Sequence, residues 1–475
     1  MLGTSSGDKL RIAVLGLGHV GLPTALGFAE MGWEVIGADD DACKVEMIRS
    51  GRAPFYEPGL DQLLSSALTG DRLSITHCVE DAVREATILF VCVGTPQKDS
   101  GEADLSQIEA IVRTIARNLN GYKLIVEKST VPAITAQWIK KTVARFAKMS
   151  SRDDLGCEFD VASNPEFLQE GRAIENIFNP DRVVIGVESD RARDLLEQLY
   201  RPLGCRILVT NISTAELTKH AANAFLSTKI SFINMVADMC DAVGADVSQV
   251  ALGMGLDPRI GTEFLNAGIG FGGYCFPKDL RAFMYLGREH GVDVGLLREV
   301  ENINLQRIDI FLRKLRDTVW VLRGKQMGVL GLAFKGGTDD IRESPALRIV
   351  RALLEEGVRL RVHDPQAMRA AEREIPCKDG RLEYATSPYE AARDAQALLV
   401  LTPWQEYREL DWREVRDSME VPVIVDGRNL LDPAVVRAAG FEYVDMGREQ
   451  AEKAAKGKIG QLAFCPAAVV NVAVK

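Results

Sequence analysis

The chain has 475 residues, too many for one ordinary domain, so we expect two or three. Apolar residues make up 47% and charged residues 26%, which is typical of globular proteins, and no uncharged apolar run reaches the roughly 18 residues of a membrane span. The net charge of −10 argues against a nucleic-acid-binding surface, but it leaves room for a local basic pocket that binds phosphates.

The cysteines and the first residues of the sequence indicate the cellular compartment. The nine cysteines are odd in number and contain no C-x-x-C pair, so we expect neither a complete disulfide framework nor a zinc or iron–sulfur site. Residues 1–9 are polar and rich in glycine and serine, which predicts a flexible tail rather than a signal peptide. A reducing, cytoplasmic location fits these features best.

The first predicted element is an apolar strand over residues 10–15. It meets the glycine turn Gly16-Leu-Gly-His-Val-Gly21, which is followed by a helix and a second strand that ends in Asp39. Glycines let such a turn approach a pyrophosphate, and the acid accepts hydrogen bonds from a ribose 2′-OH. We therefore predict that Gly16, Gly18, Val20, Gly21 and Asp39 bind NAD rather than NADP, a preference that Lys44 slightly weakens. The alternative is a glycine turn without a ligand, and the complete strand–turn–helix–acid unit argues against it.

The same pattern returns near the C-terminus. A strand over 326–331 meets glycine, a helix runs from 345 to 356, and a strand over 360–364 ends in an acid. Residues 86–96 and 123–129 resemble 395–403 and 422–428. Continuous apolar strands separated by helices indicate parallel sheets covered on both faces, so we predict an α/β fold with two doubly wound, Rossmann-like domains. The second turn, Gly331-Leu-Ala-Phe-Lys335, lacks the full glycine fingerprint, so a second dinucleotide site is not expected.

The region between the two domains is predicted to be helical. Ser213-Thr-Ala-Glu216 has the form of a capping box, with Ser213 as N-cap, and the following stretch to about residue 243 has no Pro or Gly. Residues 296–322 form a second helical candidate, and residues 253–273 are rich in glycine and irregular. The predicted domains are a tail over 1–9, an NAD-binding domain over 10–212, a central helical and dimerisation region over 213–322, a second Rossmann-like domain over 323–450, and a tail over 451–475.

The densest chemical signal is Gly268-Ile-Gly-Phe-Gly-Gly-Tyr-Cys-Phe-Pro-Lys-Asp279. Glycines such as Gly272 and Gly273 let a substrate approach the backbone, and a cation such as Lys278 favours the thiolate of Cys275, which is the nucleophilic form. The alternative is a buried structural cysteine, the interpretation preferred for most of the other cysteines.

Further polar residues lie on the predicted long helix and in loops. Lys219 and Asn223 are four residues apart and share one helix face among apolar neighbours. Glu166 follows a proline-containing turn and is either a general base or a helix-start carboxylate. Three cations at predicted strand ends suit a diphosphate, although solvated surface charge is their commoner role: Lys335, Arg342 and Arg428.

These motifs resemble the UDP-glucose/GDP-mannose dehydrogenase family. The resemblance covers roughly residues 10–450 and keeps the family's order of motifs. It rests on the glycine turn, Ser129-Thr-Val-Pro132, Asn164-Pro-Glu-Phe-Leu168, Lys219-His-Ala-Ala-Asn-Ala-Phe225, Gly270-Phe-Gly-Gly-Tyr-Cys-Phe-Pro-Lys-Asp279, Lys335-Gly-Gly-Thr-Asp-Asp-Ile-Arg342 and Asp426-Gly-Arg-Asn429. Tyr274 departs from the pattern, because many members have serine there.

The resemblance implies a four-electron oxidation. Family members oxidise the C6 alcohol of a nucleotide sugar to a carboxylate in two NAD-dependent steps, through a thiohemiacetal and a thioester on the cysteine that matches Cys275. In this scheme Lys219 and Asn223 stabilise oxyanions, Asp279 holds a water or shares a proton with Lys219, Glu166 is the base for thioester hydrolysis, and Thr130 orders the water. The sugar is expected to be UDP-glucose, giving UDP-glucuronate, with GDP-mannose or another nucleotide sugar as the alternative.

The resemblance also implies binding residues and partners. The cofactor contacts carried over are Lys44, Thr95, Thr130, Glu170, Lys278 and Arg342. The substrate contacts carried over are Glu166, Phe167, Leu168, Lys219, Asn223, Arg259, Phe264, Leu265, Gly272, Gly273, Cys275, Lys335 and Arg428. Arg259 is expected to reach the substrate from a partner subunit, which implies a homodimer or a higher oligomer. No metal, nucleic acid or membrane partner is expected. A catalytically inactive NAD sensor and a disulfide oxidoreductase are the other classes considered. The complete set of site residues argues against the first, and the lack of a nearby resolving cysteine argues against the second.

Overall fold

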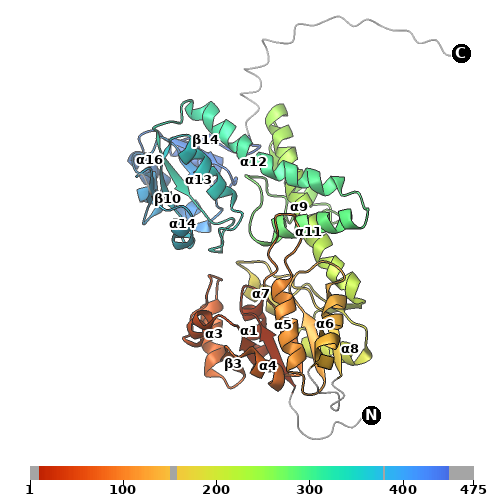
Figure 1. Cartoon of the computed structure of the whole chain (residues 1–475). Helices are drawn as coiled ribbons and strands as arrows, with labels where there is room; N and C mark the ends of the chain where they lie inside the picture. The colour runs from red at the N-terminus through yellow and green to blue at the C-terminus, as the bar shows by residue number, and fades with distance from the viewer. Residues whose placement is uncertain (1–9, 150–157, 378–379, 449–475) are drawn as a thin grey trace, which may run out of the picture.

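A computed structural model describes residues 10–149, 158–377 and 380–448. It contains two sheet domains joined by a group of long helices, and Figure 1 shows these helices running beside and between the two domains. The predicted α/β fold with two Rossmann-like domains is confirmed. The two predicted tails, over 1–9 and 451–475, lie outside the described residues, as do Cys157 and Cys465.

The N-terminal domain is built on an eight-stranded sheet in the order β3-β2-β1-β4-β5-β6-β7-β8. Neighbouring strands are parallel except β6 and β7, which pair antiparallel. The strands are β1 (Arg11–Leu15), β2 (Glu34–Ala38), β3 (Leu73–Thr76), β4 (Ile88–Val91), β5 (Lys123–Glu127), β6 (Phe159–Ser163), β7 (Arg182–Gly186) and β8 (Arg206–Thr210). The helices are α1 (Gly21–Glu30), α2 (Ala42–Arg49), α3 (Leu60–Thr69), α4 (Val79–Glu85), α5 (Ser106–Arg117), α6 (Thr135–Met149), α7 (Ala173–Phe178) and α8 (Asp190–Tyr200), with a short 3₁₀ helix, η2 (Arg201–Leu203).

Continuous apolar strands suit this sheet because both of its faces are covered. Along β1, Ile12 and Val14 enter one hydrophobic core, while Ala13 and Leu15 enter another on the opposite face. A strand buried on both sides needs apolar residues at every position rather than at alternate ones.

The C-terminal domain has a six-stranded parallel sheet in the order β11-β10-β9-β12-β13-β14. Its strands are β9 (Gln326–Leu330), β10 (Arg359–His363), β11 (Leu382–Tyr384), β12 (Leu398–Val400), β13 (Val423–Asp426) and β14 (Glu442–Val444). Its helices are α13 (Pro345–Glu355), α14 (Met368–Glu374), α15 (Pro388–Ala392), α16 (Trp412–Ser418) and α17 (Pro433–Ala438), with a 3₁₀ helix, η3 (Gln405–Glu409). In both sheets the first strand of the domain lies inside the sheet, and the strand order reverses beside it.

Four helices connect the two sheets: α9 (Ile212–Val243), α10 (Val247–Gly255), α11 (Cys275–Glu289) and α12 (Gly295–Val319). Both α11 and α12 pack on α9. The predicted long helix is present, but the predicted capping box is wrong. Asn211 is the N-cap, and its side chain accepts a hydrogen bond from the amide of Thr214. Glu216 instead points away from the helix end and binds the backbone of the N-terminal domain.

Candidate active site

The long helix α9 presents two of the predicted residues to the rest of the site. Lys219 and Asn223 are both buried, as the four-residue spacing predicts for one face of a helix. The ammonium of Lys219 lies 3.1 Å from Oε1 of Glu166, in the loop after β6, and both side chains are about 5% exposed. Burial by itself lowers the pKa of Lys219, but Glu166, Cys275 and Asp279 together raise it above the ordinary lysine value. Lys219 is therefore a buried cation.

Asp279, one turn after the start of α11 at Cys275, connects several of the other polar groups. Its Oδ2 accepts a hydrogen bond from the amide of Asn223 at 2.6 Å, and its Oδ1 accepts one from Lys278 at 2.6 Å. Burial alone would raise the pKa of Asp279, yet the charges of Lys278, His220 and Lys219 lower it. Asp279 is therefore a buried carboxylate that fixes Asn223 and neutralises Lys278.

Cys275 is the half-buried first residue of α11, and its thiol is within the electrostatic reach of Asp279, Glu166 and Lys219. Burial, followed by the charges of Asp279 and Glu166, raises the pKa of its thiol to about 12, and Lys219 only partly offsets this effect. Lys219 acts in the expected direction, because it lowers the pKa of the thiol, but burial and the two carboxylates outweigh it. The balance in the free protein therefore favours the thiol over the thiolate.

The glycines before Cys275 allow a close contact with the C-terminal domain. A Cβ added to Gly272 would lie 2.3 Å from the carbonyl oxygen of Glu343, and one added to Gly273 would lie 2.7 Å from the ring of Phe334. Gly273 also has a φ of +80°, which other residues rarely adopt. These two glycines let the segment pack against the C-terminal domain on the side where a Cβ would lie.

The predicted cofactor turn has the geometry of a dinucleotide site. A Cβ on Gly16 or Gly21 would collide with backbone, at 2.9 Å from Cys92 O and 1.7 Å from Gly16 O. A Cβ on Gly18 would meet no described atom within 4 Å, so the turn leaves open space where a phosphate approaches. Val20 is the N-cap of α1. The turn therefore fits the cofactor that its sequence predicts.

Asp39 lies directly after β2, at the edge of this turn. Its carboxylate accepts hydrogen bonds from the amides of Leu17 at 2.7 Å and Asp41 at 3.1 Å. Both of its oxygens lie 2.9 Å from the ammonium of Lys44. A ribose that binds Asp39 must share the carboxylate with this lysine.

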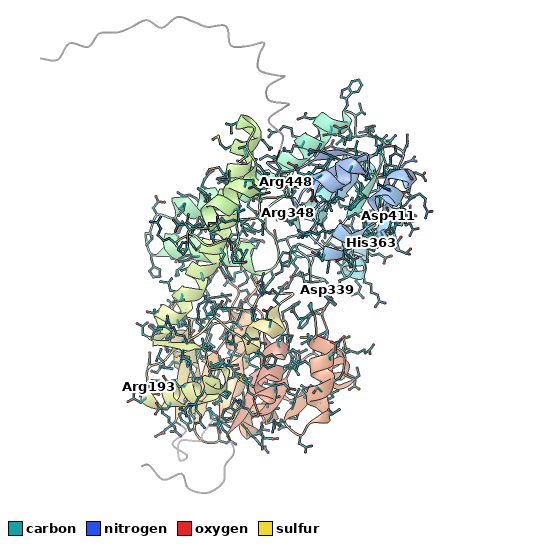
Figure 2. All side chains as sticks on the ribbon, turned by 180° about the vertical axis from the view of Figure 1, so that it is seen from behind. Arg193, Asp339, Arg348, His363, Asp411 and Arg448 are labelled. Atoms are coloured by element: carbon teal, nitrogen blue, oxygen red, sulfur yellow. The ribbon has the colours of Figure 1, made fainter. Side chains whose placement is uncertain are left out.

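The junction between the two sheet domains collects further predicted residues. Arg342 is held by Asp340 through two parallel contacts, and its guanidinium lies 4.3 Å from the ring centroid of Tyr274. Lys278 lies 5.4 Å from the same ring, so Tyr274 contacts two cations. Asp339, labelled in Figure 2, marks this junction between the domains. Tyr274 therefore organises two of the proposed cofactor contacts.

Glu170 and two threonines complete that junction. Burial and the charge of Asp340 raise the pKa of Glu170 to about 7, while Arg342, whose guanidinium lies 4.0 Å away, lowers it. The hydroxyl of Thr95 donates to the carbonyl of Thr130 at 2.9 Å and lies 3.4 Å from the ammonium of Lys278. The N-terminal domain thus reaches both the central helices and the C-terminal domain here.

The predicted substrate contacts have varied surroundings. The ring of Phe167 faces two cations, with its centroid 4.0 Å from the guanidinium of Arg182 and 5.4 Å from the ammonium of Lys219. Burial lowers the pKa of Lys335. Arg428 is half-buried and donates to three carbonyls, those of Leu401, Gly270 and Phe334. Leu168 lines a small cavity of about 80 Å³ together with Glu166 and Phe167. Phe264 is half-buried and has a φ of +64°, and Leu265 is packed in a hydrophobic core.

Arg259 is the predicted residue that the chain does not bring to the cluster. Its side chain is 87% exposed and contacts Asp257. Beside the cluster, a cavity of about 440 Å³ opens between α11 and the C-terminal domain. It is lined by Gln97, Tyr274, Pro277, Lys278, Arg281, Ile341, Arg342, Glu343, Ser344, Leu347, Arg348, Arg351 and Glu374.

Some residues of this region were not predicted. The ring of His220 binds the carbonyl of Val131 at 2.7 Å, and its position next to Lys219 was the available signal. Glu57 accepts the amides of Gly171 and Ala173, both at 2.7 Å, and Lys128 lies 3.1 Å from the side-chain oxygen of Asn164. Nothing in the sequence places Glu57 near residues more than a hundred positions away.

Among the residues that the structure describes, no group of three or more His, Cys, Asp or Glu residues is arranged to hold a metal ion. None of the helices described is long and apolar enough to cross a membrane.

A dinucleotide turn at the switch point of a parallel sheet, with a cysteine, a lysine and carboxylates nearby, defines a nucleotide-dependent oxidoreductase. Three family models match the chain in order: the NAD binding domain of the UDP-glucose/GDP-mannose dehydrogenase family over residues 10–204, its central domain over 213–306, and its UDP binding domain over 328–433. The chain belongs to the UDP-glucose/GDP-mannose dehydrogenase family, and NAD is its cofactor.

Individual relatives agree with this assignment. The chain is 43% identical to the UDP-glucose 6-dehydrogenase TuaD of Bacillus subtilis (strain 168), covering 92% of this chain and 93% of that protein. It is 41% identical to the UDP-glucose 6-dehydrogenase of Rhizobium meliloti (strain 1021), covering 92% and 100%. Among solved structures, a UDP-glucose dehydrogenase from Pyrobaculum islandicum superposes with a TM-score of 0.85 at 38% identity, covering 95% and 100%.

Proposed function

We propose that this enzyme oxidises the C6 alcohol of UDP-glucose to the carboxylate of UDP-glucuronate in two NAD-dependent steps. One observation carries the proposal: the half-buried Cys275 lies within the electrostatic reach of the buried Lys219–Glu166 ion pair and of Asp279, which binds Asn223. A cysteine is needed only if an aldehyde is to be captured and oxidised further. The names of the relatives described above support UDP-glucose as the sugar nucleotide.

The first oxidation produces an aldehyde at C6. NAD, when bound, supplies the hydride acceptor for both oxidations. Lys219, kept cationic by Glu166, and the amide of Asn223 stabilise the negative charge that develops on the C6 oxygen. Asp279 fixes the orientation of that amide and keeps the charge of Lys278 balanced.

The cysteine then captures the aldehyde. A bond forms between Sγ of Cys275 and C6, and the thiol proton ends on the C6 oxygen beside Lys219, which gives a thiohemiacetal. The second oxidation removes a hydride and a proton from that carbon and oxygen, leaving a thioester. Glu166 takes a proton from a water ordered by Thr130, and the hydroxide attacks the thioester carbon. The bond between C6 and Sγ then breaks, and the departing sulfur takes up the proton held by Glu166, which restores the thiol and leaves the carboxylate of the product.

Binding is proposed to use the junction between the sheets. Asp39 holds the adenosine ribose, and the turn residues Gly16, Gly18, Val20 and Gly21 hold the pyrophosphate. Thr95, Glu170, Lys278 and Arg342 serve the nicotinamide end. Lys335 serves the UDP diphosphate, and Arg428 holds the glycine segment through its three carbonyl contacts. The UDP-sugar contacts proposed with them are Phe167, Leu168, Phe264, Leu265, Gly272 and Gly273.

We propose that the enzyme is at least a homodimer. The outer face of α9 exposes a stripe of large apolar side chains at successive spacings of seven, three and four residues: Phe225, Phe232, Met235 and Met239. Exposed apolar stripes of this kind mark protein interfaces. Arg259, 87% exposed in the single chain, would then serve the partner's site. The seven described cysteines are all free, which supports a reducing, cytoplasmic location.

Product stoichiometry tests the proposed reaction. We expect two NADH for each UDP-glucose consumed, little free aldehyde, and faster turnover than with UDP-N-acetylglucosamine or GDP-mannose. Glu166→Gln should complete both oxidations and then stall, giving a burst of NADH and a covalent mass on the Cys275 peptide. Release of one NADH with free aldehyde would overturn the covalent route, and preference for another sugar nucleotide would overturn the substrate.

Mixing variants tests the shared site. Arg259→Ala and Cys275→Ser should each be nearly inactive alone. Mixed dimers should regain activity, because one of their two sites then carries neither change. No recovery, with subunit exchange shown by mass spectrometry, would contradict a site completed by the partner.

A further inference from the structure

Two buried carboxyl groups join the helix α9 to the N-terminal domain, and neither has a role in the reaction proposed above. Glu127 ends β5 and is 0% exposed, and Glu216 lies near the start of α9 and is 2% exposed. Glu216 accepts the amide of Ile134 at 2.7 Å with one oxygen and the amide of Ala136 at 2.9 Å with the other. Glu216 therefore ties α9 to the turn that begins α6.

Glu127 has no comparable partner. In the part of the chain that the structure describes, no donor lies within hydrogen-bonding distance of either of its oxygens. The polar group against it is the carboxyl of Glu216, which is also an acceptor when ionised. Two adjacent buried carboxylates would combine desolvation with repulsion, so one of them must hold a proton that the other accepts. Burial and the neighbouring Glu216 accordingly raise the pKa of Glu127 well above its ordinary value.

The segment held by this pair is the one that carries Thr130. Ile134 has a φ of +79°, a left-handed conformation that is strained for a β-branched residue and persists only when its surroundings hold it. Its amide is one of the two that Glu216 binds. One turn further along α9, His220 binds the carbonyl of Val131. Helix α9 thus holds the segment from residue 130 to 136 at two points.

We propose that Glu127 and Glu216 share one proton, and that this carboxyl pair positions the Thr130 segment against α9, beside Lys219 and Asn223. Both are positioning residues, since neither touches the reacting atoms. Loss of the shared proton would place two negative charges side by side and loosen the segment.

Within the described part of the chain, the side chains packed around the pair are mainly apolar. On the same face of the sheet, α5 and α6 contribute apolar side chains, among them Ile108, Val112 and Ile139. His220 is the neighbouring titratable group on α9, and the charges that act on it include those of Asp279 and Lys278. Within the described residues, Glu127 and Glu216 therefore titrate mainly against each other.

The sign of the pH dependence follows from the raised pKa. A carboxyl group whose pKa is higher in the folded than in the unfolded chain contributes stability that is fully present below the unfolded value. That contribution is lost as the pH rises through the folded value. Glu127→Gln keeps the size and a donor toward Glu216 but cannot ionise. Glu188→Gln, at an exposed carboxylate paired with Lys140, is the matched control.

The experiment compares the wild type with these two variants from pH 5 to pH 9. Above the ordinary carboxyl pKa, the unfolding constant of the wild type relative to Glu127→Gln should rise by up to about tenfold per pH unit. Glu188→Gln should follow the wild type. At pH 7 the infrared carbonyl band of a protonated carboxylic acid should appear in the difference between wild type and Glu127→Gln. The proposal would be overturned if the unfolding constants of wild type and Glu127→Gln had the same pH dependence, or if the infrared band were absent.

Kinetics test the positioning role, and this part rests on the proposed function. With UDP-glucose, Glu127→Gln should keep a kcat close to wild type at neutral pH. Its alkaline decline in kcat should begin at higher pH, while the KM for UDP-glucose stays unchanged. If the pH profile of kcat were the same in Glu127→Gln and wild type while the infrared band was present, the shared proton would stand and only the positioning of Thr130 would be overturned. Absence of any UDP-glucose oxidation would instead count against the proposed function and leave the infrared and unfolding results decisive for the pair.

Discussion

The two sheet domains place an aspartate at the same point, directly after the second strand, and surround it differently. Asp39 in the N-terminal domain accepts two backbone amides and is otherwise paired with the partly exposed cation of Lys44. Asp364 in the C-terminal domain accepts the amides of four residues and the indole N–H of Trp404: Leu332, Ala333, Gln366 and Ala367. The carboxylate of Asp39 can exchange its contact with Lys44 for a contact with a ligand. The lone pairs of the Asp364 carboxylate are all used by its five donors.

The turns before these acids differ for a related reason. Gly336 stands five residues after Gly331, as Gly21 stands five after Gly16. However, α1 begins at Gly21, while α13 begins only at Pro345. The longer connection removes the helix N-terminus that would face a phosphate, and its residues pack instead against Gly272 and Gly273. One architecture thus provides a cofactor site in the first domain and a wall of the active site in the second.

The largest effect we expect comes from the cluster between the domains. Cys275→Ser should lower kcat by at least about a thousandfold, because a hydroxyl is a weaker nucleophile and a seryl ester hydrolyses slowly. NAD and UDP-glucose should still bind, as calorimetry can measure. The exposed Cys43→Ser is the control and should keep full activity. Near-normal turnover of Cys275→Ser would show that the chemistry lies elsewhere.

The next largest effect should be a difference between Asp364 and Asp39 in their contribution to the free energy of unfolding. Asp364→Ala leaves five buried donors without an acceptor and should lower the free energy of unfolding by about 3 kcal/mol or more. The same change at Asp39 removes fewer fixed contacts and should lower it by only about 1 kcal/mol. Denaturant unfolding of both variants measures the difference. Equal losses would mean that the two environments are energetically alike.

The third effect concerns the reactivity of the Cys275 thiol, because the lysines near it are paired with carboxylates. Because burial and carboxylates raise its pKa to about 12, its thiolate fraction should rise about tenfold per pH unit from pH 7 to pH 10. In the free enzyme at pH 7, iodoacetamide should therefore modify the exposed Cys43 before Cys275. Peptide mass spectrometry gives both rates. A fast, pH-independent reaction of Cys275 would mean that Lys219 outweighs its neighbours.

The smallest effect should appear in cofactor choice. Asp39→Ala should raise the KM for NAD by about tenfold and narrow its preference over NADP, since one charge-assisted hydrogen bond to the ribose is worth roughly 1.5–3 kcal/mol. Asp364→Ala, tested at a temperature where it is folded, should leave the NAD/NADP ratio unchanged. A change in that ratio at Asp364 would show that the second sheet also binds the cofactor.

The local signals of the sequence were sufficient for the architecture. Apolar runs, the glycine turn and two acid-ended strands predicted two Rossmann-like domains, and a stretch without Pro or Gly predicted α9. These signals depend on neighbouring residues, so they can be recognised without knowing the fold. The helix start was mispredicted because Asn211, Ser213 and Glu216 all have suitable capping side chains, and only the position of the N-terminal domain decides that Glu216 binds elsewhere.

The sequence by itself determined the fold class, the cofactor turn and the residue types of the site. Tertiary structure decided their electrostatics, because charge depends on distance and burial rather than on sequence spacing. It paired Lys219 with Glu166 and Lys278 with Asp279, which left Cys275 as a thiol. It also packed Phe334 and Glu343 against the glycines and brought Glu127 to Glu216 from 89 positions away, contacts that no local pattern encodes.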